Sequence, residues 1–437
     1  MNQDPPETLL GRHMSVMQVV IVAITVGLNA LDGFDVLSIS FASPGIAREW
    51  GINRAALGIV LSMELLGMSI GSIALGTLAD RLGRRHTLIA SLLLMTLGMG
   101  LAAGAGGIGP LCAWRVLTGI GIGGVLATTN ALATEFSSER RRDLAVSMMA
   151  IGYPMGAVIG GLIVAQLLKH HTWHAIFVWG AIATAAFIPA VLLWVPESVA
   201  WLSHRQPAGA LERLNRSLTR IGHGTVKALP PRAIQVARHS LLELFAPNLA
   251  LRTLLVTLSY FLHITTFYFI LKWVPKIVVD MGFTPSSAAG VLVWANIGGV
   301  TGGAVLGLLT QRWTLRYLTA GFLILSTLMV SVFGHGQNTL AGLSLICALT
   351  GFCTNGGVVG LYAVLARAFP ASLRAGGTGL VIGIGRGGAM LAPIIAGYLF
   401  QNGFGLQYVA IAMSSGSLVA ALCLIMLRLD QRGVTPA

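Results

Sequence analysis

Long apolar runs alternate with short polar stretches from one end of the chain to the other. A run of about 20 apolar residues is long enough to cross a bilayer as a helix. Twelve such runs cover residues 16–42, 54–78, 86–105, 109–132, 144–168, 174–195, 252–275, 285–310, 315–334, 339–367, 373–400 and 404–428. We therefore expect an all-α membrane protein with twelve transmembrane helices.

One polar stretch, residues 197–251, is longer than the others and divides the runs into two sets of six. We expect a cytoplasmic linker with short amphipathic helices, because leucine and isoleucine recur at helical spacing between residues 211 and 221. The predicted order is a cytoplasmic tail (1–15), a six-helix bundle (16–196), the linker (197–251), a second six-helix bundle (252–428) and a cytoplasmic tail (429–437).

Composition agrees with a membrane location. Of the 437 residues, 55% are hydrophobic and only 10% are charged, whereas soluble proteins carry about 25% charged residues. The net charge of +13 comes from basic residues scattered over short loops, which argues against a nucleic-acid partner. Most of these residues fall on one side of the membrane if the N-terminus is inside. Because basic loops remain in the cytoplasm, both termini are predicted to be cytoplasmic.

Two carboxylates lie inside the first apolar run. Asp32 and Asp35 are the only charged residues between Arg12 and Arg48, and their spacing puts them on one helix face. Carboxylates inside a membrane are costly and often mark proton relays. Two of them close together titrate as a coupled pair, so we interpret Asp32 and Asp35 as proton-coupling residues. The structural alternative is that they pair with a buried arginine or cap a helix break at Gly33.

The two sets of six helices share a weak internal repeat. The loop after the second run reads GTLADRLGRRHTL, and the loop after the eighth reads GLLTQRWTLRYL. Offsets of 231 to 233 residues match Gly76 with Gly307, Arg81 with Arg312, Phe136 with Phe369, Arg141 with Arg374 and Gly152 with Gly385. A consistent offset indicates a duplicated six-helix unit, with substrate held near the membrane midplane between the halves.

Several motifs resemble those of one large transporter family. GTLADRLGRR resembles the signature loop between helices 2 and 3 of the major facilitator superfamily, RVLTGIGIGG its fourth helix and PES the end of its sixth. DGFD and FPASLRAGGTGLVIGIGRGGAMLAP resemble its aromatic acid:proton symporter branch. The resemblance covers about residues 15–430 and implies two pseudo-symmetric six-helix bundles. It also implies proton-driven import of an organic acid anion, through the inner membrane of a bacterium, by a monomer without a cofactor.

The signature loop is expected to act as a cytoplasmic gate. The Asp80 carboxylate could pair with arginine and with a helix N-terminus of the opposite half while that side is closed. Gly76 and Gly83 would allow a tight turn and close contact. The predicted gating residues are Gly76, Asp80, Arg81, Gly83, Arg84, Arg85, Glu135 and Arg374. The alternative is that these arginines only set topology and contact lipid headgroups.

Two arginines inside apolar runs are candidate ligands of an anion. Arg115 lies about 9 Å from the outer end of its helix, near the expected level of Asp35, and could pair with Asp35 or Asp32. Such a pair could exchange its carboxylate for that of a substrate, or it could be a permanent ion pair. Arg386 lies midway along a glycine-rich run that contains no acid. Because guanidinium matches carboxylate with two parallel hydrogen bonds, Arg386 is the predicted anchor, unless an acid from another helix, such as Glu64, pairs with it.

Other residues near the midplane could line a substrate cavity. Aromatic rings can stack on a planar acid, although each ring could instead face lipid or the bundle core. The predicted substrate-binding residues beside the two arginines are Tyr153, Tyr260, Asn296 and Asn355. His263 is expected to be a hydrogen-bonded bundle residue and Trp273 to lie at the outer interface. Lys272 is expected to extend its amine to the membrane surface or to serve as a second cationic anchor.

These features favour an importer over other functions. The main alternative is a proton antiporter that exports drugs or metabolites, which would not need Arg386. A channel would lack coupling, and no HExxH or GxSxG motif indicates an enzyme. The sequence predicts no catalytic residue and no metal site. The predicted partners are a small organic acid anion, protons and membrane lipid.

Overall fold

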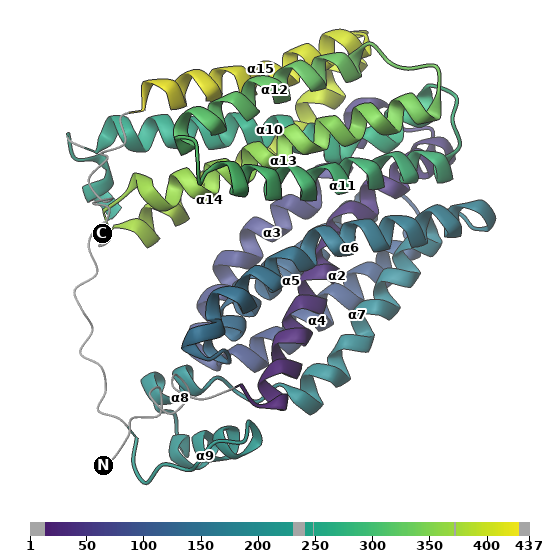
Figure 1. The fold of residues 1–437 in the computed structure, drawn as a ribbon. Helices are drawn as coiled ribbons and strands as arrows, with labels where there is room; N and C mark the ends of the chain where they lie inside the picture. Colours follow the sequence, from purple (N-terminus) through teal and green to yellow (C-terminus); the bar gives the residue numbers. More distant parts are fainter. Residues whose placement is uncertain (1–13, 230–240, 248, 371–372, 428–437) are drawn as a thin grey trace. The chain divides into compact units, whose positions relative to one another are not determined.

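The structure is a computed structural model that describes residues 14–229, 241–247, 249–370 and 373–427. Within these ranges, twelve helices are long and apolar enough to cross a membrane. Figure 1 shows how the helices follow one another along the chain. The predicted fold class, an all-α membrane protein, is confirmed. The predicted tails fall almost entirely outside the described residues.

Six of these helices precede the linker. They are α2 (Val16–Trp50), α3 (Arg54–Leu82), α4 (Arg84–Ala103), α5 (Ile108–Glu135), α6 (Arg142–His170) and α7 (His174–Trp194), with a short 3-10 turn, η1 (Glu139–Arg141), before α6. The other six follow the linker. They are α10 (Ala250–Asp280), α11 (Pro285–Leu309), α12 (Leu315–Gly334), α13 (Leu340–Ala368), α14 (Arg374–Gln401) and α15 (Leu406–Met426).

The described part of the linker contains two short helices, α8 (Val199–Arg205) and α9 (Ala210–Arg220), and a 3-10 turn, η2 (Leu241–Phe245). Leu214 and Leu218 of α9 are buried on one face, while Glu212 and Arg216 are exposed on the other. The predicted amphipathic helix is therefore confirmed. Residues 230–240 of the linker lie outside the described residues.

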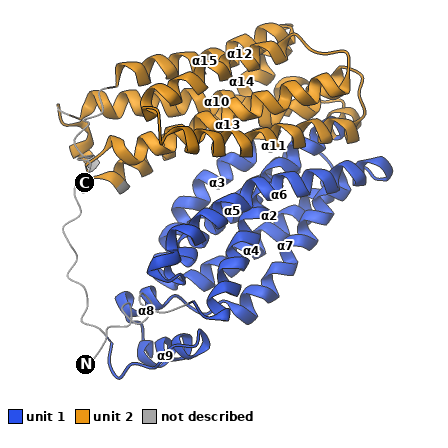
Figure 2. Ribbon diagram, in the orientation of Figure 1, with its two compact units in different colours: residues 1–45, 63–236 blue, residues 46–62, 237–437 orange. Residues whose placement is uncertain are grey.

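The chain forms two compact units (Figure 2). One contains the described residues up to 45 and those from 63 to 236, and the other contains residues 46–62 and the described residues from 237 onwards. Residues 46–62, which include the C-terminal end of α2 and the first turns of α3, are grouped with the second set of helices. There Arg54 forms an ion pair with Asp280, with 3.1 Å between Nη2 and Oδ2, and Gly58 lies against the main chain at Pro393.

Two helix crossings are closed by glycines, one in each unit. A methyl group at Gly71 would collide with the Ile120 carbonyl where α3 crosses α5, and one at Gly302 would collide with the Phe352 carbonyl where α11 crosses α13. Small residues at such crossings let transmembrane helices make backbone contact. Gly71 and Gly302 are 231 residues apart, which is the offset of the sequence repeat. The two bundles thus repeat one helix crossing.

Helix α2 is longer than the sequence indicated. It continues past the expected end near Ala42 to Trp50, with Pro44 inside it. Proline removes one helical hydrogen bond, which frees the carbonyl four residues earlier. Here the Ser43 hydroxyl donates to that Ser40 carbonyl at 2.8 Å, and such side-chain compensation is how transmembrane helices tolerate proline. Asp35 is consequently about 22 Å from the C-terminal end of its helix, and not near that end as expected.

Candidate functional site

Two buried aspartates lie midway along α2. The side chains of Asp32 and Asp35 are 0% exposed. Among the described residues, no group donates a hydrogen bond to either carboxylate. Asp32 is within electrostatic range of Asp35 and Glu64, and Asp35 is within range of Arg115 and Glu64. The sequence correctly placed these acids inside the first long apolar helix, and the structure adds a third acid beside them.

That third acid, Glu64 of α3, forms the ion pair of Arg115. The distance between Arg115 Nη2 and Glu64 Oε2 is 2.6 Å, and both side chains are fully buried. The expectation that Arg115 pairs with an aspartate carboxylate is therefore wrong. Arg115 instead donates to the main-chain carbonyl of Asp35 at 3.1 Å. The rest of the guanidinium contacts Met99 Sδ at 3.0 Å and lies 5.3 Å from the Phe177 ring centre.

Charge balance in this cluster is uneven, because it contains one guanidinium, Arg115, and three carboxylates. Glu64 already neutralises Arg115 at 2.6 Å. An unpaired carboxylate away from water is costly, and a buried acid avoids that cost by taking up a proton. Asp32 and Asp35 can therefore be held in the uncharged form while Glu64 remains paired. Ionisation of Asp35 would place a second anion beside Arg115 in competition with Glu64.

The second unit contains the predicted anion anchor. Arg386 is half-buried midway along α14. The preceding residue, Gly385, lies against the Tyr260 ring, where a methyl group would collide with ring carbons. The Tyr260 hydroxyl is hydrogen-bonded to the Tyr362 hydroxyl of α13, with 3.1 Å between the oxygens. Tyr260 is also within electrostatic range of the Arg386 charge. The structure thus brings Arg386 and Tyr260 together and adds Tyr362.

The other predicted cavity residues lie in both units. Asn296 is half-buried and donates to the Leu292 carbonyl of its own helix at 2.9 Å. Asn355 donates to the Gly299 carbonyl of α11 at 2.7 Å. Tyr153 is half-buried in α6, and its main chain lies against Gly33 of α2. Their roles in substrate binding stay predictions.

Three residues of α10 for which the sequence predicted a position, His263, Lys272 and Trp273, are all buried. His263 is fully buried and bonds to the Ser417 hydroxyl and the Thr354 carbonyl, each at 2.8 Å, so its expected role as a hydrogen-bonded core residue is confirmed. Lys272 is 0% exposed, so its amine does not extend to the surface as one expectation held. Trp273 is 1% exposed and donates to the Pro393 carbonyl, so its side chain packs among the helices, and its expected position at the outer interface stays a prediction.

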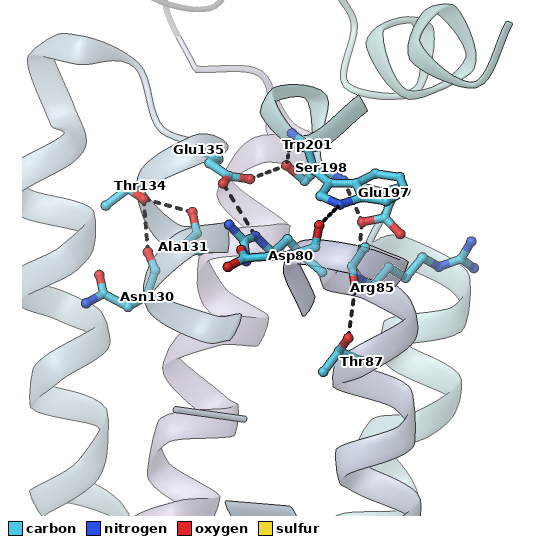
Figure 3. Close-up of polar contacts among 12 residues, drawn as sticks. Asp80, Arg85, Thr87, Asn130, Ala131, Thr134, Glu135, Glu197, Ser198 and Trp201 are labelled. Carbon is cyan, nitrogen blue, oxygen red and sulfur yellow. Dashed lines mark hydrogen bonds and ion pairs between the residues drawn. The ribbon is translucent and has the colours of Figure 1, made fainter. Parts of the chain in front are cut away.

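The predicted gating loop lies at one end of the first unit (Figure 3). Asp80 Oδ1 forms an ion pair with Arg84 Nη1 at 2.7 Å, and Arg84 Nε is 3.8 Å from Glu135 Oε1. Glu135 accepts a hydrogen bond from the Ser198 hydroxyl, and Trp201 Nε1 donates to the Asp80 carbonyl at 3.0 Å. The ends of α3 and α5 are therefore joined to the start of α8.

Glu197 of the PES motif completes this cluster. Its Oε1 accepts from the Arg85 main-chain N–H at 3.1 Å, and its Oε2 is 3.0 Å from His86 Nδ1. A carboxylate at the first turn of a helix is stabilised by the free N–H groups and the helix dipole, so Glu197 caps α4. Gly83 has φ +108° and lies directly against this carboxylate, which explains the need for glycine there.

Three other predicted gating residues, Arg81, Arg374 and Gly76, show less evidence of a role in the gate. Arg81 and Arg374 are exposed. Gly76 lies inside α3 and not in a turn, and a methyl group there would make only an ordinary contact with Ala127 at 3.5 Å. The expected tight turn is therefore correct for Gly83 and wrong for Gly76.

Sequence reasoning missed two functional candidates, Ser198 and Tyr362, and named Glu64 only as a possible partner of Arg386 and not of Arg115. Glu64 is the only acid in α3 between Arg54 and Asp80, which was a signal for a partner of a buried arginine. Ser198 precedes an apolar segment and accepts from the Trp201 N–H at 2.9 Å, as expected for a helix N-cap. Tyr362 had no local signal, because its role depends on the packing of α13 against α10.

The described residues contain no cluster of three or more His, Cys, Asp or Glu side chains that could hold a metal ion.

The fold matches that of solved transporters. The xylose transporter XylE from E. coli, in a partially occluded inward-open conformation, aligns with a TM-score of 0.72 at 16% identity, over 97% of this chain and 100% of that chain. A crystal structure of a D-xylose-proton symporter aligns with a TM-score of 0.71 at 16% identity, over 96% and 99% of the two chains.

In the described part of the chain, twelve helices long and apolar enough to cross a membrane form two related bundles, each with buried charged side chains, as in a multi-pass membrane protein. Residues 25–353 match the Major Facilitator Superfamily, and the chain belongs to this family.

Proteins with similar sequences indicate which members of the family this chain resembles. The chain is 31% identical to the 3-(3-hydroxy-phenyl)propionate transporter of Escherichia coli (strain K12), over 94% of this chain and 96% of that protein. It is 29% identical to the gallate transporter of Pseudomonas putida, over 97% and 94% of the two chains. It is also 29% identical to the 4-hydroxybenzoate transporter PcaK of Pseudomonas putida, over 88% and 86%. The predicted resemblance to aromatic acid transporters is therefore confirmed, and the protein is a transporter and not an enzyme.

Proposed function

We propose that this protein imports an aromatic carboxylate together with protons, by alternating access. The substrate class is supported by the relatives, whose names specify transport of 4-hydroxybenzoate, gallate and 3-(3-hydroxy-phenyl)propionate. We further propose that it works as a monomer in the inner membrane of a bacterium, with both termini in the cytoplasm and lipid around the bundles.

One observation carries the proton-coupling part of the proposal. Asp32 and Asp35 are fully buried, and no described group donates a hydrogen bond to their carboxylates. Groups that were only structural would be expected to have such partners, because buried polar groups are normally hydrogen-bonded. A carboxyl group that carries a proton during transport has a different requirement. It is stable in this buried position while it is protonated, and its ionisation there costs free energy because no described group donates to the carboxylate.

The proposed cycle begins with protonation from the outer side. A proton binds at Asp32 or Asp35 while Glu64 holds Arg115 at 2.6 Å. The anion then binds at Arg386, and the halves rock so that the inner side opens. Loss of the proton to the cytoplasm leaves Asp35 charged beside Arg115, which then attracts both Asp35 and Glu64. This change in ion pairing resets the cycle.

Arg386 is the proposed anchor for the substrate carboxylate, and Asn296, Asn355, Tyr153 and Tyr260 are proposed as further substrate-binding residues. Arg115 is 0% exposed and paired with Glu64. It could bind a substrate anion only after that pair opens, so we assign it first to coupling.

Cotransport with protons is energetically useful for such a substrate. Entry of an anion is opposed by an inside-negative potential, at about 2.3 kcal/mol per charge per 100 mV. One proton per carboxylate cancels this electrical cost, and an inside-alkaline pH gradient then drives accumulation. The cluster around Asp80, Arg84 and Glu135 is proposed to stabilise the closed cytoplasmic side.

Transport in liposomes tests the coupling. Asp32→Asn and Asp35→Asn keep size and polarity but cannot titrate. At least one variant, more readily Asp35→Asn because of its contact with Arg115, should exchange labelled 4-hydroxybenzoate at equal pH yet fail to accumulate it when the inside is alkaline. Asp143→Asn, at an exposed residue of α6, is the matched control. Full pH-driven accumulation in both test variants would refute the assignment, and accumulation driven by an acidic interior would instead indicate an antiporter.

Binding to purified protein tests the anchor. Arg386→Ala should abolish binding of 4-hydroxybenzoate, and Arg386→Lys should weaken it, because lysine keeps the charge but loses the planar two-pronged geometry. Arg213→Ala, at an exposed residue of α9, is the control. Wild-type affinity in Arg386→Ala would show that the anion binds elsewhere.

A further inference from the structure

Beside the proposed anchor lies a pair of phenols with a spare hydrogen-bond donor. The Tyr260 and Tyr362 hydroxyls share one hydrogen bond of 3.1 Å, and their ring centres are 5.7 Å apart. Two hydroxyls bring two hydrogens, and one bond between them uses only one. Among the described residues, neither hydroxyl makes another hydrogen bond, so the pair retains one O–H donor without an acceptor.

The position of this donor links it to Arg386. The Tyr260 ring lies directly against Gly385, the residue before Arg386, and the phenol is within electrostatic range of the guanidinium. Tyr260 is 4% exposed and Tyr362 is 45% exposed. The buried phenol is therefore fixed by packing, whereas the more accessible one is free to meet a ligand.

We propose that the Tyr260–Tyr362 pair is a specificity-determining element that donates one hydrogen bond to the substrate carboxylate held by Arg386. This inference rests on the proposed function, because it requires an anion at Arg386. Tyr260 donates to Tyr362 and so positions it, and the Tyr362 O–H then points to the ligand oxygen.

The carboxylate is a better acceptor for this donor than a hydroxyl on the substrate ring. Hydrogen bonds to a charged oxygen are about twice as strong as those between neutral groups. A carboxylate that binds guanidinium through two parallel bonds keeps further lone pairs, since its two oxygens together offer about four acceptor positions. Arg386 and the phenol pair can therefore hold the same group from two helices, α14 and α13. The element then selects for the acid function and is indifferent to ring hydroxylation.

Binding of two acids that differ only in a ring hydroxyl tests this inference. Benzoate and 4-hydroxybenzoate are titrated into detergent-purified full-length protein at pH 7. Tyr362→Phe and the double variant Tyr260→Phe/Tyr362→Phe keep both rings and remove hydroxyls. Loss of a hydrogen bond to a charged group is expected to weaken binding of both acids about tenfold and by the same factor. Tyr260→Phe alone should cause a smaller loss, because Tyr362 keeps its O–H. Tyr398→Phe, at an exposed tyrosine of α14, is the control.

Each alternative outcome is distinct. Unchanged affinity for both acids in the double variant would overturn the inference, and so would a loss confined to 4-hydroxybenzoate, which would make the pair a reader of the ring hydroxyl. Arg386→Ala is measured in parallel. If it loses binding while the double variant does not, only the inference fails. If it binds as the wild type does, or if the wild type binds neither acid, the proposed function fails and the inference falls with it.

Discussion

The buried ion pair between Glu64 and Arg115 allows a quantitative prediction. Glu64→Gln keeps the shape of the side chain but removes its charge, which leaves the guanidinium uncompensated where both side chains are 0% exposed. Breaking a buried pair in this way costs about 3–5 kcal/mol. Because glutamine still offers one carbonyl oxygen to Arg115 at a 2.6 Å contact, we expect the free energy of unfolding to fall by about 3 kcal/mol, the lower end of that range.

The chain offers a matched control for this substitution. Glu212 and Arg216 of α9 form the same type of pair, with 2.8 Å between Oε1 and Nη2, but their side chains are 78% and 75% exposed. Exposed pairs of this spacing contribute about 0.3–0.5 kcal/mol, so Glu212→Gln should be nearly neutral. Replacing both buried partners, as in Glu64→Gln/Arg115→Met, removes the uncompensated charge and should recover most of the loss.

Chemical denaturation in detergent micelles, followed by tryptophan fluorescence, is measured for the wild type, the single variants Glu64→Gln, Arg115→Met and Glu212→Gln, and the double variant. The reasoning is refuted if Glu64→Gln costs no more than Glu212→Gln, or if the double variant is as unstable as the sum of its single changes. Transport gives a second readout. In Glu64→Gln the Asp35 carboxylate becomes the partner within electrostatic range of Arg115, so pH-driven accumulation should fall even in the folded fraction.

Two further predictions concern stability and proton transfer. Gly83→Ala should lower the melting temperature by several degrees, because alanine is strained at φ +108° and its methyl would meet the Glu197 carboxylate. The control Gly106→Ala, at a glycine in open space, should leave the melting temperature unchanged. Equal melting temperatures for the two variants would contradict the capping role of Glu197. His263→Gln should leave the pH dependence of transport unchanged while lowering stability, because His263 acts as a hydrogen-bonding bridge between helices; a shifted pH profile would instead make it a proton carrier.

The helices were predictable because each apolar run has to satisfy its backbone inside the membrane. Eleven of the twelve expected spans agree with the helices to within five residues at each end, and α2 shows where prediction from the sequence fails. Ser43, Pro44 and Gly45 are typical of a helix end, yet the helix continues to Trp50. The Ser43 hydroxyl that bonds to the Ser40 carbonyl makes this possible, and that compensation depends on a rotamer that the sequence does not specify.

The charged residues of the site were also predictable, but their partners were not. Arg115, Asp32 and Asp35 are conspicuous in apolar runs, because each is costly there. The choice of partner depends on how closely α3 approaches α5. Gly119, one turn after Arg115, lies directly against the Glu64 carbonyl, and this contact brings the two helices near enough for the pair to form. Depth along a helix could be estimated from residue counts, whereas helix rotation could not.

The internal repeat shows that packing alone does not require the Glu64–Arg115 pair. Gly119 lies against the Glu64 carbonyl, and Gly351, 232 residues later, lies against the Ala295 carbonyl in the same way. At the same offset, Arg115 corresponds to Cys347. The equivalent crossing of α11 and α13 therefore holds a buried alanine and a buried cysteine, and the second bundle folds with no ion pair at that crossing. Since a buried ion pair is seldom more stable than apolar residues of similar volume, its presence in the first bundle alone calls for a functional reason. Its contact with Asp35, through the hydrogen bond from Arg115 to the main chain, provides one in the proposed proton coupling.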